Sequence, residues 1–125
     1  MKVSLSPLKS LLENNVCEIK FSRRRLKPGE PSTRRMLCTN SFSLLNSLNG
    51  KLLLNYKQPK RLPKFSPAAK NLIVTWDILM QDYRCINVDA CEVISTIPVG
   101  EKFWEYFNTK LRFMTIQEKE RFMDV

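Results

Sequence analysis

The sequence predicts an α+β fold that is mainly β: a small antiparallel barrel with a short helix before it and helices after it. Three observations lead to this prediction. Several runs of strand length are rich in β-branched and aromatic residues. Two of these runs alternate apolar and polar residues, which is the period of a half-buried strand. Near the end of the chain the apolar residues instead recur at helical spacing.

Residues 71–97 carry the clearest strand pattern. We expect strands at Leu72–Trp76, Tyr83–Val88 and Glu92–Ile97, with polar turns between them. Short connections usually join neighbouring strands. The sequence therefore predicts a meander, in which each of these strands pairs with the next.

The segments before the meander predict a helix and a hairpin. Ser6 and Pro7 have the residue types of an N-cap and a first helical position, and the helix should end at Asn14–Asn15. A strand follows at Val16–Phe21, with its odd-numbered residues facing the core. A turn at residues 28–32 leads to a return strand at Arg34–Thr39.

The remaining elements are short helices and one long loop. A short helix is expected at Asn40–Leu45, ending near Asn49–Gly50, and an extended loop at Lys51–Lys70. A helix should begin at Glu101, and a capping box at Thr115–Glu118 opens a last helix. The length fits a single domain, residues 1–125, with an N-terminal helix (1–15), a barrel (16–97) carrying a basic insertion (51–70) and a helical extension (98–125).

Positive charge is concentrated in the first half of the chain. The formal net charge is +9, and residues 1–70 contain 15 Lys and Arg residues but three acidic residues. Residues 71–100 contain one basic and four acidic residues. Such asymmetry favours a positive surface that attracts polyanions over about a Debye length, roughly 8–10 Å.

Two segments carry this charge, and together they form the predicted nucleic-acid-binding site. A hairpin is expected to bring like charges together, which costs stability unless a polyanion or solvent screens them. The alternative is a hairpin end that is merely solvated. The predicted contact residues are Arg23, Arg24, Arg25, Lys27, Arg34 and Arg35 in the hairpin, and Lys57, Lys60, Arg61 and Lys64 in the insertion.

Aromatic residues occur within the basic insertion and on the first C-terminal helix. Tyr56 and Phe65 either stack on bases or fix the loop to the core. Phe103, Trp104 and Phe107 form one broad apolar stripe. That stripe either packs on the barrel or forms a surface for a partner or for self-association.

No arrangement of catalytic or metal-binding residues is recognisable. The chain has no His, and its three glycines form no phosphate-binding loop. The four cysteines lack Cys-x-x-Cys spacing, so reduced, mostly buried thiols are favoured over a zinc site. A cluster of Asp77, Asp82 and Asp89 around a divalent cation is the weaker alternative to ordinary turn chemistry. We expect no enzyme, no cofactor and no metal.

A family resemblance rests on four segments. Residues 11–16 (LLENNV), 35–40 (RMLCTN), 71–77 (NLIVTWD) and 83–89 (YRCINVD) resemble the small WYL-related, Sm-like (SH3-like) β-barrel proteins of tailed phages. The last segment departs from the family's aromatic-Arg-Ser-Phe-Arg motif at Cys85, Ile86 and Asn87. The resemblance covers roughly residues 11–97 and implies the barrel fold, with nucleic-acid or regulatory-ligand binding among wider relatives.

These observations predict a non-catalytic, phage-type barrel that binds DNA or RNA without sequence specificity. The alternative is an interaction module that binds a host or phage protein, or that assembles with copies of itself. The chain lacks an apolar run long enough for a membrane span and a recognisable secretory signal, so we expect it in the host cytoplasm.

Overall fold

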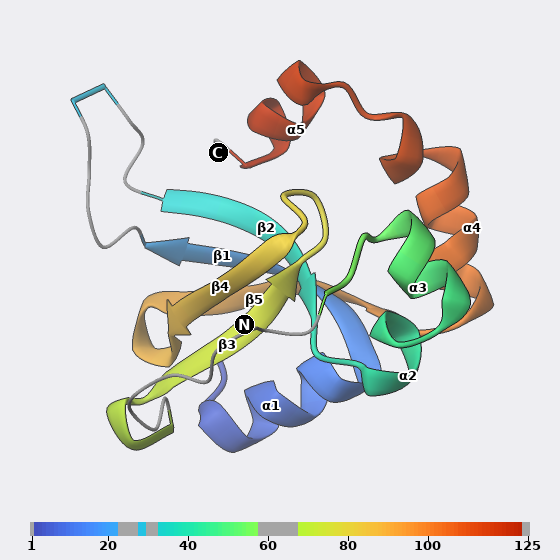
Figure 1. The fold of residues 1–125 in the computed structure, drawn as a ribbon. Helices are drawn as coiled ribbons and strands as arrows, with labels where there is room; N and C mark the ends of the chain where they lie inside the picture. The colour runs from blue at the N-terminus through green and yellow to red at the C-terminus, as the bar shows by residue number, and fades with distance from the viewer. Residues whose placement is uncertain (1, 23–27, 30–32, 58–67, 124–125) are drawn as a thin grey trace.

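A computed structural model describes residues 2–22, 28–29, 33–57 and 68–123 (Figure 1). It contains one five-stranded antiparallel sheet with the strand order β4-β3-β2-β1-β5. The strands are β1 (Asn15–Ser22), β2 (Thr33–Thr39), β3 (Leu72–Asp77), β4 (Asp82–Asn87) and β5 (Cys91–Pro98). The predicted α+β class and the five predicted strand positions are confirmed.

Helices lie before, between and after the strands. The α-helices are α1 (Leu5–Asn14), α2 (Phe42–Leu45), α3 (Leu48–Leu53), α4 (Glu101–Thr109) and α5 (Ile116–Met123). Three short 3₁₀ helices are η1 (Ala68–Lys70), η2 (Val88–Ala90) and η3 (Leu111–Phe113). Figure 1 shows α1 along one side of the sheet, α2, α3 and α4 gathered at one end, and α5 beside β2.

The predicted meander is wrong at its last strand. β3 and β4 pair as a hairpin, but β5 pairs with β1, at the opposite edge of the sheet from β4. Alternation predicts where a strand lies and which face is apolar, but the edge with which it pairs depends on the whole sheet.

The sheet must be strongly curled, because η2 alone joins its two edges. The four residue steps from Asn87 to Cys91 span at most about 14 Å, even if fully extended. The edges of a flat five-stranded sheet lie about 19 Å apart, at roughly 4.8 Å per strand. A bulge in the β1–β5 pairing, where Glu18 pairs with Ser95 but Ile19 pairs with Val93, adds to this bending.

One apolar cluster lies inside the curl and includes residues from all five strands. Leu8 and Leu12 of α1 are fully buried against it. The strand residues in this cluster are Cys17, Ile19, Met36, Cys38, Ile73, Ile86, Cys91 and Val93. The odd-numbered face of β1 therefore points to the core, as predicted.

A second apolar cluster lies on the other face of the sheet. Val16, Leu37 and Trp76 pack there against helical residues, among them Phe103 and Phe107 of α4. The sheet is therefore covered on both faces, and both faces of its central strands contain buried residues.

Two predicted boundaries differ from the structure. α1 begins at Leu5 with Ser4 as N-cap, so Pro7 lies within the first turn, where its missing N–H is not needed. The extended loop expected from Lys51 begins later, because Ser47 Oγ accepts a hydrogen bond from the Gly50 amide (2.9 Å) and caps α3. The predicted capping box before α5 is confirmed: Thr115 Oγ1 accepts from the Glu118 amide at 3.1 Å.

Candidate nucleic-acid interface

Three of the predicted contact residues, Arg34, Arg35 and Lys57, lie within the part of the chain that the structure describes. The others, Arg23, Arg24, Arg25, Lys27, Lys60, Arg61 and Lys64, lie outside the described residues, as does Phe65. The two undescribed internal stretches, residues 23–32 and 58–67 apart from Pro28 and Gly29, contain seven of the 21 Lys and Arg residues and one acidic residue. The location of their described flanks is therefore informative.

Three of the four described flanks of these two segments meet at one end of the sheet. Ser22 and Thr33, which flank the first segment, are register partners at the ends of β1 and β2. The second segment is followed by η1 and then by Asn71, whose carbonyl accepts a hydrogen bond from the Val88 amide of η2 (3.0 Å). η2 leads directly to Cys91, the register partner of Phe21. We call this end of the sheet, formed by Ser22, Thr33, η1 and η2, the basic end.

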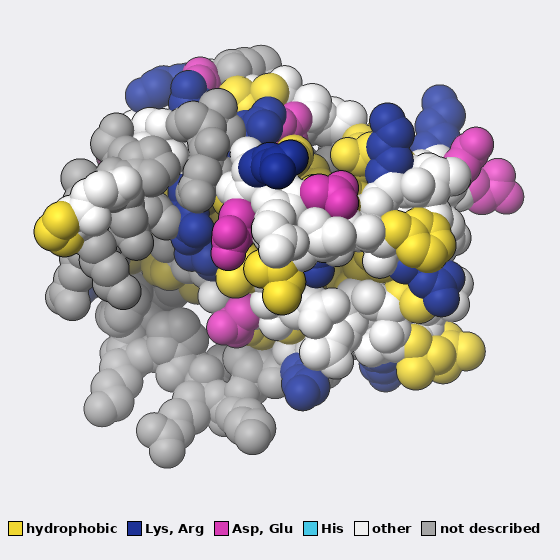
Figure 2. All heavy atoms as spheres, turned by 90° about the horizontal axis from the view of Figure 1, so that it is seen from above, with side chains coloured by type: hydrophobic (Ala, Val, Ile, Leu, Met, Phe, Trp, Pro, Cys, Tyr) yellow, Lys and Arg dark blue, Asp and Glu magenta, His cyan; other side chains and the backbone are white. Residues whose placement is uncertain are grey.

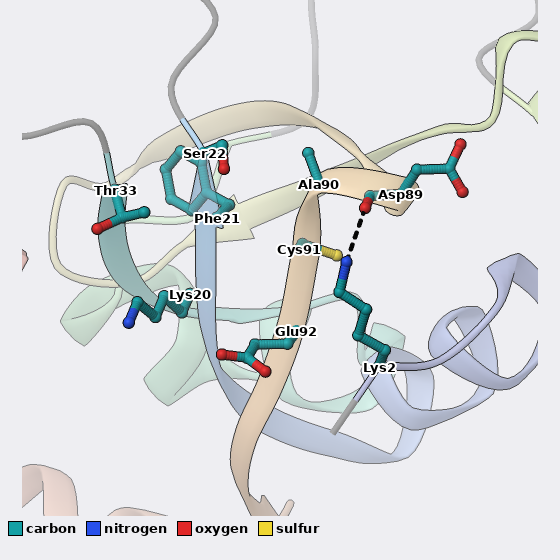
Figure 3. A pocket seen from close by; sticks show the side chains of 9 residues that line it. All are labelled: Lys2, Lys20, Phe21, Ser22, Thr33, Asp89, Ala90, Cys91 and Glu92. Atoms are coloured by element: carbon teal, nitrogen blue, oxygen red, sulfur yellow. Dashed lines mark hydrogen bonds between the residues drawn. The ribbon is translucent and has the colours of Figure 1, made fainter.

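A hollow of about 270 Å³ opens at the basic end (Figure 3). Figure 3 shows Lys2 reaching toward η2, where its Nζ donates to the Asp89 carbonyl oxygen at 3.2 Å, while the Asp89 carboxylate points away. The lining residues are Lys2, Lys20, Phe21, Ser22, Thr33, Asp89, Ala90, Cys91 and Glu92. Figure 3 shows the ammonium groups of Lys2 and Lys20 on opposite sides of the two strands, so each suits a separate phosphate, and Glu92 limits how much negative charge the hollow accepts.

Three lysines of the basic end were not among the predicted contacts. Lys2 and Lys20 line the hollow, and Lys70 is an exposed residue of η1. Alternation places Lys20 on the outer face of its strand, but the sequence does not show that its neighbours in space are η2 and the hairpin. Lys57 does not belong to this end, because the adjacent Tyr56 packs against Trp76 at the far end of β3.

Arg35 is engaged within the chain. Its Nη1 donates to Glu18 Oε1 at 3.0 Å, and its Nε donates to the Phe122 carbonyl oxygen at 3.0 Å. The guanidinium carbon also lies 4.5 Å from the centre of the Phe122 ring. Through these contacts Arg35 connects α5 to the sheet. Its side chain is 30% exposed.

Tyr56 fixes its loop to the core. Its ring makes edge-on contacts with Trp76 (5.1 Å between ring centres) and with Tyr83 (6.0 Å), and its hydroxyl group accepts from Tyr83 at 2.6 Å. Burial, together with this hydrogen bond, raises the pKa of Tyr83. Of the two predicted roles for Tyr56, the structure favours attachment to the core over base stacking.

The predicted partner surface on α4 needs correction. Phe103 is fully buried and Phe107 is 6% exposed, because both pack onto the outer face of the sheet. A partner cannot reach Phe103 while α4 stays in place, and Phe107 is reachable only at its small exposed edge. Trp104 is half-buried and is the one member of the three that reaches the surface.

The three aspartates do not cluster. Asp77 and Asp82 are register partners at one end of the β3–β4 hairpin, whereas Asp89 lies in η2 at the other end. Asp77 is fully buried and accepts from the Leu79 and Met80 amides and from Arg84 Nε (2.9 Å). Among the described residues, no group of three or more Cys, Asp or Glu side chains could hold a metal ion.

The face seen from above has no large area of one charge in its described part. Figure 2 shows Lys and Arg, Asp and Glu, and apolar side chains interspersed there. By sequence, the two undescribed internal segments hold seven basic residues and one acidic residue, or +6 of the formal net charge of +9.

Comparisons of the chain with protein-family models, with curated proteins and with solved structures give no match. Within residues 2–22, 28–29, 33–57 and 68–123, none of the helices combines the length and the apolar character that a bilayer crossing requires.

Proposed function

We propose that this chain is a non-catalytic nucleic-acid-binding protein that holds phosphates at its basic end. The observation that carries this proposal is that both described flanks of the first basic segment and the C-terminal flank of the second meet around η2. Lys2, Lys20 and Lys70 add positive charge to the same place. Contacts made mainly to phosphates give little sequence preference and a steep dependence on salt.

We also propose that the curled sheet is a small Sm-like (SH3-like) barrel. Two features support this: a three-residue link between the edge strands, and an interior cluster drawn from every strand. Membership of the WYL-related phage family and a location in the host cytoplasm belong to the same proposal, and both rest on the sequence resemblance.

The test is a binding titration with two charge-matched variants. The probe is a fluorescein-labelled single strand of about 16 nucleotides, DNA in one arm and RNA in the other, followed by anisotropy at several salt concentrations. The first variant changes Arg23, Arg24 and Arg25 to Gln. The matched control changes Lys102, Lys110 and Arg112 to Gln, which removes the same charge from α4, from η3 and from the residue between them.

We expect the first variant to bind more weakly, with a salt slope lower by about 2, the value for three lost contacts to a single strand. The control should bind nearly as well as the parent. Equal weakening in both variants would show that net charge alone attracts the probe. No weakening in the first variant would remove the ground for the proposal.

A second candidate function is the binding of a protein partner, favoured by an apolar groove of about 170 Å³ beside α3. Leu52, 69% exposed, lies at its edge next to the buried Leu79 and Phe107, and its charged lining residues are Arg112 and Lys119. An apolar groove with a cationic rim fits an amphipathic segment that carries carboxylates.

The probe for this function is a helical peptide with Leu at core spacing and Glu on its flanks. A matched peptide has Lys in place of Glu. Leu52→Gln and Arg112→Gln should each weaken binding of the Glu peptide, and the Lys peptide should not bind. Equal binding of both peptides would eliminate this candidate.

A further inference from the structure

Two basic side chains lie directly opposite each other on the outer face of the basic end. Lys20 of β1 and Arg35 of β2 are register partners, and Glu92 of β5 is the partner of Lys20 on its other side. Register partners in an antiparallel sheet project from the same face, and like charges placed opposite each other are destabilising. Glu18 already pairs with Arg35 Nη1 (3.0 Å), so the repulsion is partly neutralised, and an anion bound between Lys20 and Arg35 would have to use the remaining donors of the guanidinium.

Helix α5 occupies the Arg35 side of this pair. Its last turn supplies both the carbonyl oxygen that accepts from Arg35 Nε (3.0 Å) and the Phe122 ring beside the guanidinium (4.5 Å). The Nε–H is one of the two donors that a guanidinium uses in a side-on bidentate contact with phosphate. The Phe122 carbonyl therefore blocks the strongest way in which Arg35 could bind phosphate.

The attachment of α5 to the sheet is slight. The helix has eight residues, Ile116 is 74% exposed, and Met123 is its buried residue. A helix this short is marginal without tertiary contacts, and segments with few buried residues open at low cost. Phe122, which is partly buried, supplies the main contact with Arg35.

We propose that α5 is a displaceable cap over a phosphate-binding pair formed by Lys20 and Arg35. A phosphate of the bound nucleic acid takes the place of the Phe122 carbonyl on Arg35 and is held from the other side by Lys20. This inference rests on the proposed function and adds a means of regulating it: whatever stabilises α5 on β2 weakens binding.

The test is a double-mutant cycle of Phe122→Ala and Arg35→Gln, with the same labelled single-stranded DNA and salt titration. Phe122→Ala should bind about tenfold more tightly than the parent, the gain of one charge-assisted contact, with a salt slope higher by about 0.7. Arg35→Gln alone should weaken binding less than it does in the Phe122→Ala background, because in the parent the cost of displacing the Phe122 carbonyl offsets part of the gain from the phosphate contact. In the double variant the gain should disappear.

Two controls separate uncapping from general loosening of the fold. Ile116→Ala changes the exposed face of α5 and should bind as the parent does. Phe122→Leu keeps an apolar side chain but removes the ring, and should give a smaller gain even if Phe122→Ala is too unstable. In the parent, saturating DNA should also speed amide hydrogen exchange in residues 117–123.

The outcomes distinguish the two proposals. If the parent binds DNA but the Phe122 variants bind equally well, or if DNA leaves exchange in α5 unchanged, the cap is wrong and the proposed function stands. Binding by the Phe122 variants but not by the parent would support the cap in its strongest form. If no variant binds, both proposals fail.

Discussion

At the scale of single residues, Asp77 is the most constrained charged group that the structure describes. Burial raises the pKa of Asp77 above its ordinary value, although the Met80 and Leu79 amides and the Arg84 guanidinium act in the opposite direction. The carboxylate is fully enclosed and holds the turn between β3 and β4 through three hydrogen bonds. Its role is structural, and the cost of burying it can be measured.

Asp77→Asn should lower the free energy of unfolding at neutral pH by about 1–3 kcal/mol, because the amide nitrogen faces the Arg84 donor. The wild-type pKa is higher in the folded than in the unfolded state. The stability contributed by the neutral carboxyl group is therefore complete below the unfolded value, about 3.9, and is lost as pH rises through the folded value. The difference between wild type and variant should widen as the pH is lowered toward about 4.

Urea unfolding of both proteins at several pH values checks this expectation. If the difference in unfolding free energy between wild type and Asp77→Asn narrows as the pH is lowered, Arg84 stabilises the carboxylate more than burial destabilises it.

The four thiols should differ sharply in reactivity. Cys85 is exposed on β4, whereas burial raises the pKa of Cys17 to about 11 and also raises the pKa of Cys38 and Cys91. Because the thiolate is the reacting form, iodoacetamide should modify Cys85 first and the other three after unfolding. Peptide mass spectrometry identifies the site, and Cys85→Ser should remove the fast phase. Rapid labelling at Cys17 or Cys38 would contradict the burial seen here.

At the scale of elements, α2 and α3 pack through a glycine. A Cβ at Gly50 would lie 2.1 Å from the Leu44 carbonyl oxygen and 2.8 Å from that of Leu45, both of them backbone atoms. Gly50→Ala should therefore force the two helices apart and lower the free energy of unfolding by about 1–3 kcal/mol. The neighbouring exposed Lys51→Ala should change it by less than about 0.5 kcal/mol. Urea denaturation measures both, and a neutral Gly50→Ala would show that α3 moves freely.

Helix α4 tests the distinction between core and partner surface. Phe103→Ala should cost about 3–5 kcal/mol of unfolding free energy, because a fully buried ring leaves a cavity. Trp104→Ala should cost less, since that side chain is half-buried. Equilibrium unfolding of the two variants decides the order. A larger loss of unfolding free energy for Trp104→Ala than for Phe103→Ala would mean that Trp104, and not Phe103, lies on the buried face of α4.

At the scale of the whole molecule, local patterns predicted the elements and the two hairpins, β1 with β2 and β3 with β4, but not the partner of β5. The alternation in residues 16–21 and 92–97 indicated β1 and β5, because the period of a strand is visible in its own residues. The pairing of β5 with β1 depends on the curl of the sheet, and this curl cannot be predicted from the residues of any single segment. The spacing of Phe103 and Phe107 likewise predicted an apolar helix face. It did not show that the sheet buries this face.

The candidate site shows the same limit. Counting charges identified the basic segments, and the sheet register then brought three of their four flanks together with Lys2 and Lys20. Sequence reasoning treated Arg34 and Arg35 alike, yet Arg35 contacts a helix 87 positions later in the chain. A contact over that separation has no local signature.

The pairing of β1 with β5 also governs how the protein can be made. While the polypeptide leaves the ribosome, β1 can pair with β2 early, but β5, the strand for its other edge, is the last of the five strands to be synthesised. Until residues 91–98 emerge, β1 keeps an unpaired edge and the apolar cluster lacks Cys91 and Val93, so the sheet is completed only after its other four strands have been made. The fold is therefore completed from its C-terminal side, and an incomplete chain exposes the apolar residues that the finished molecule hides.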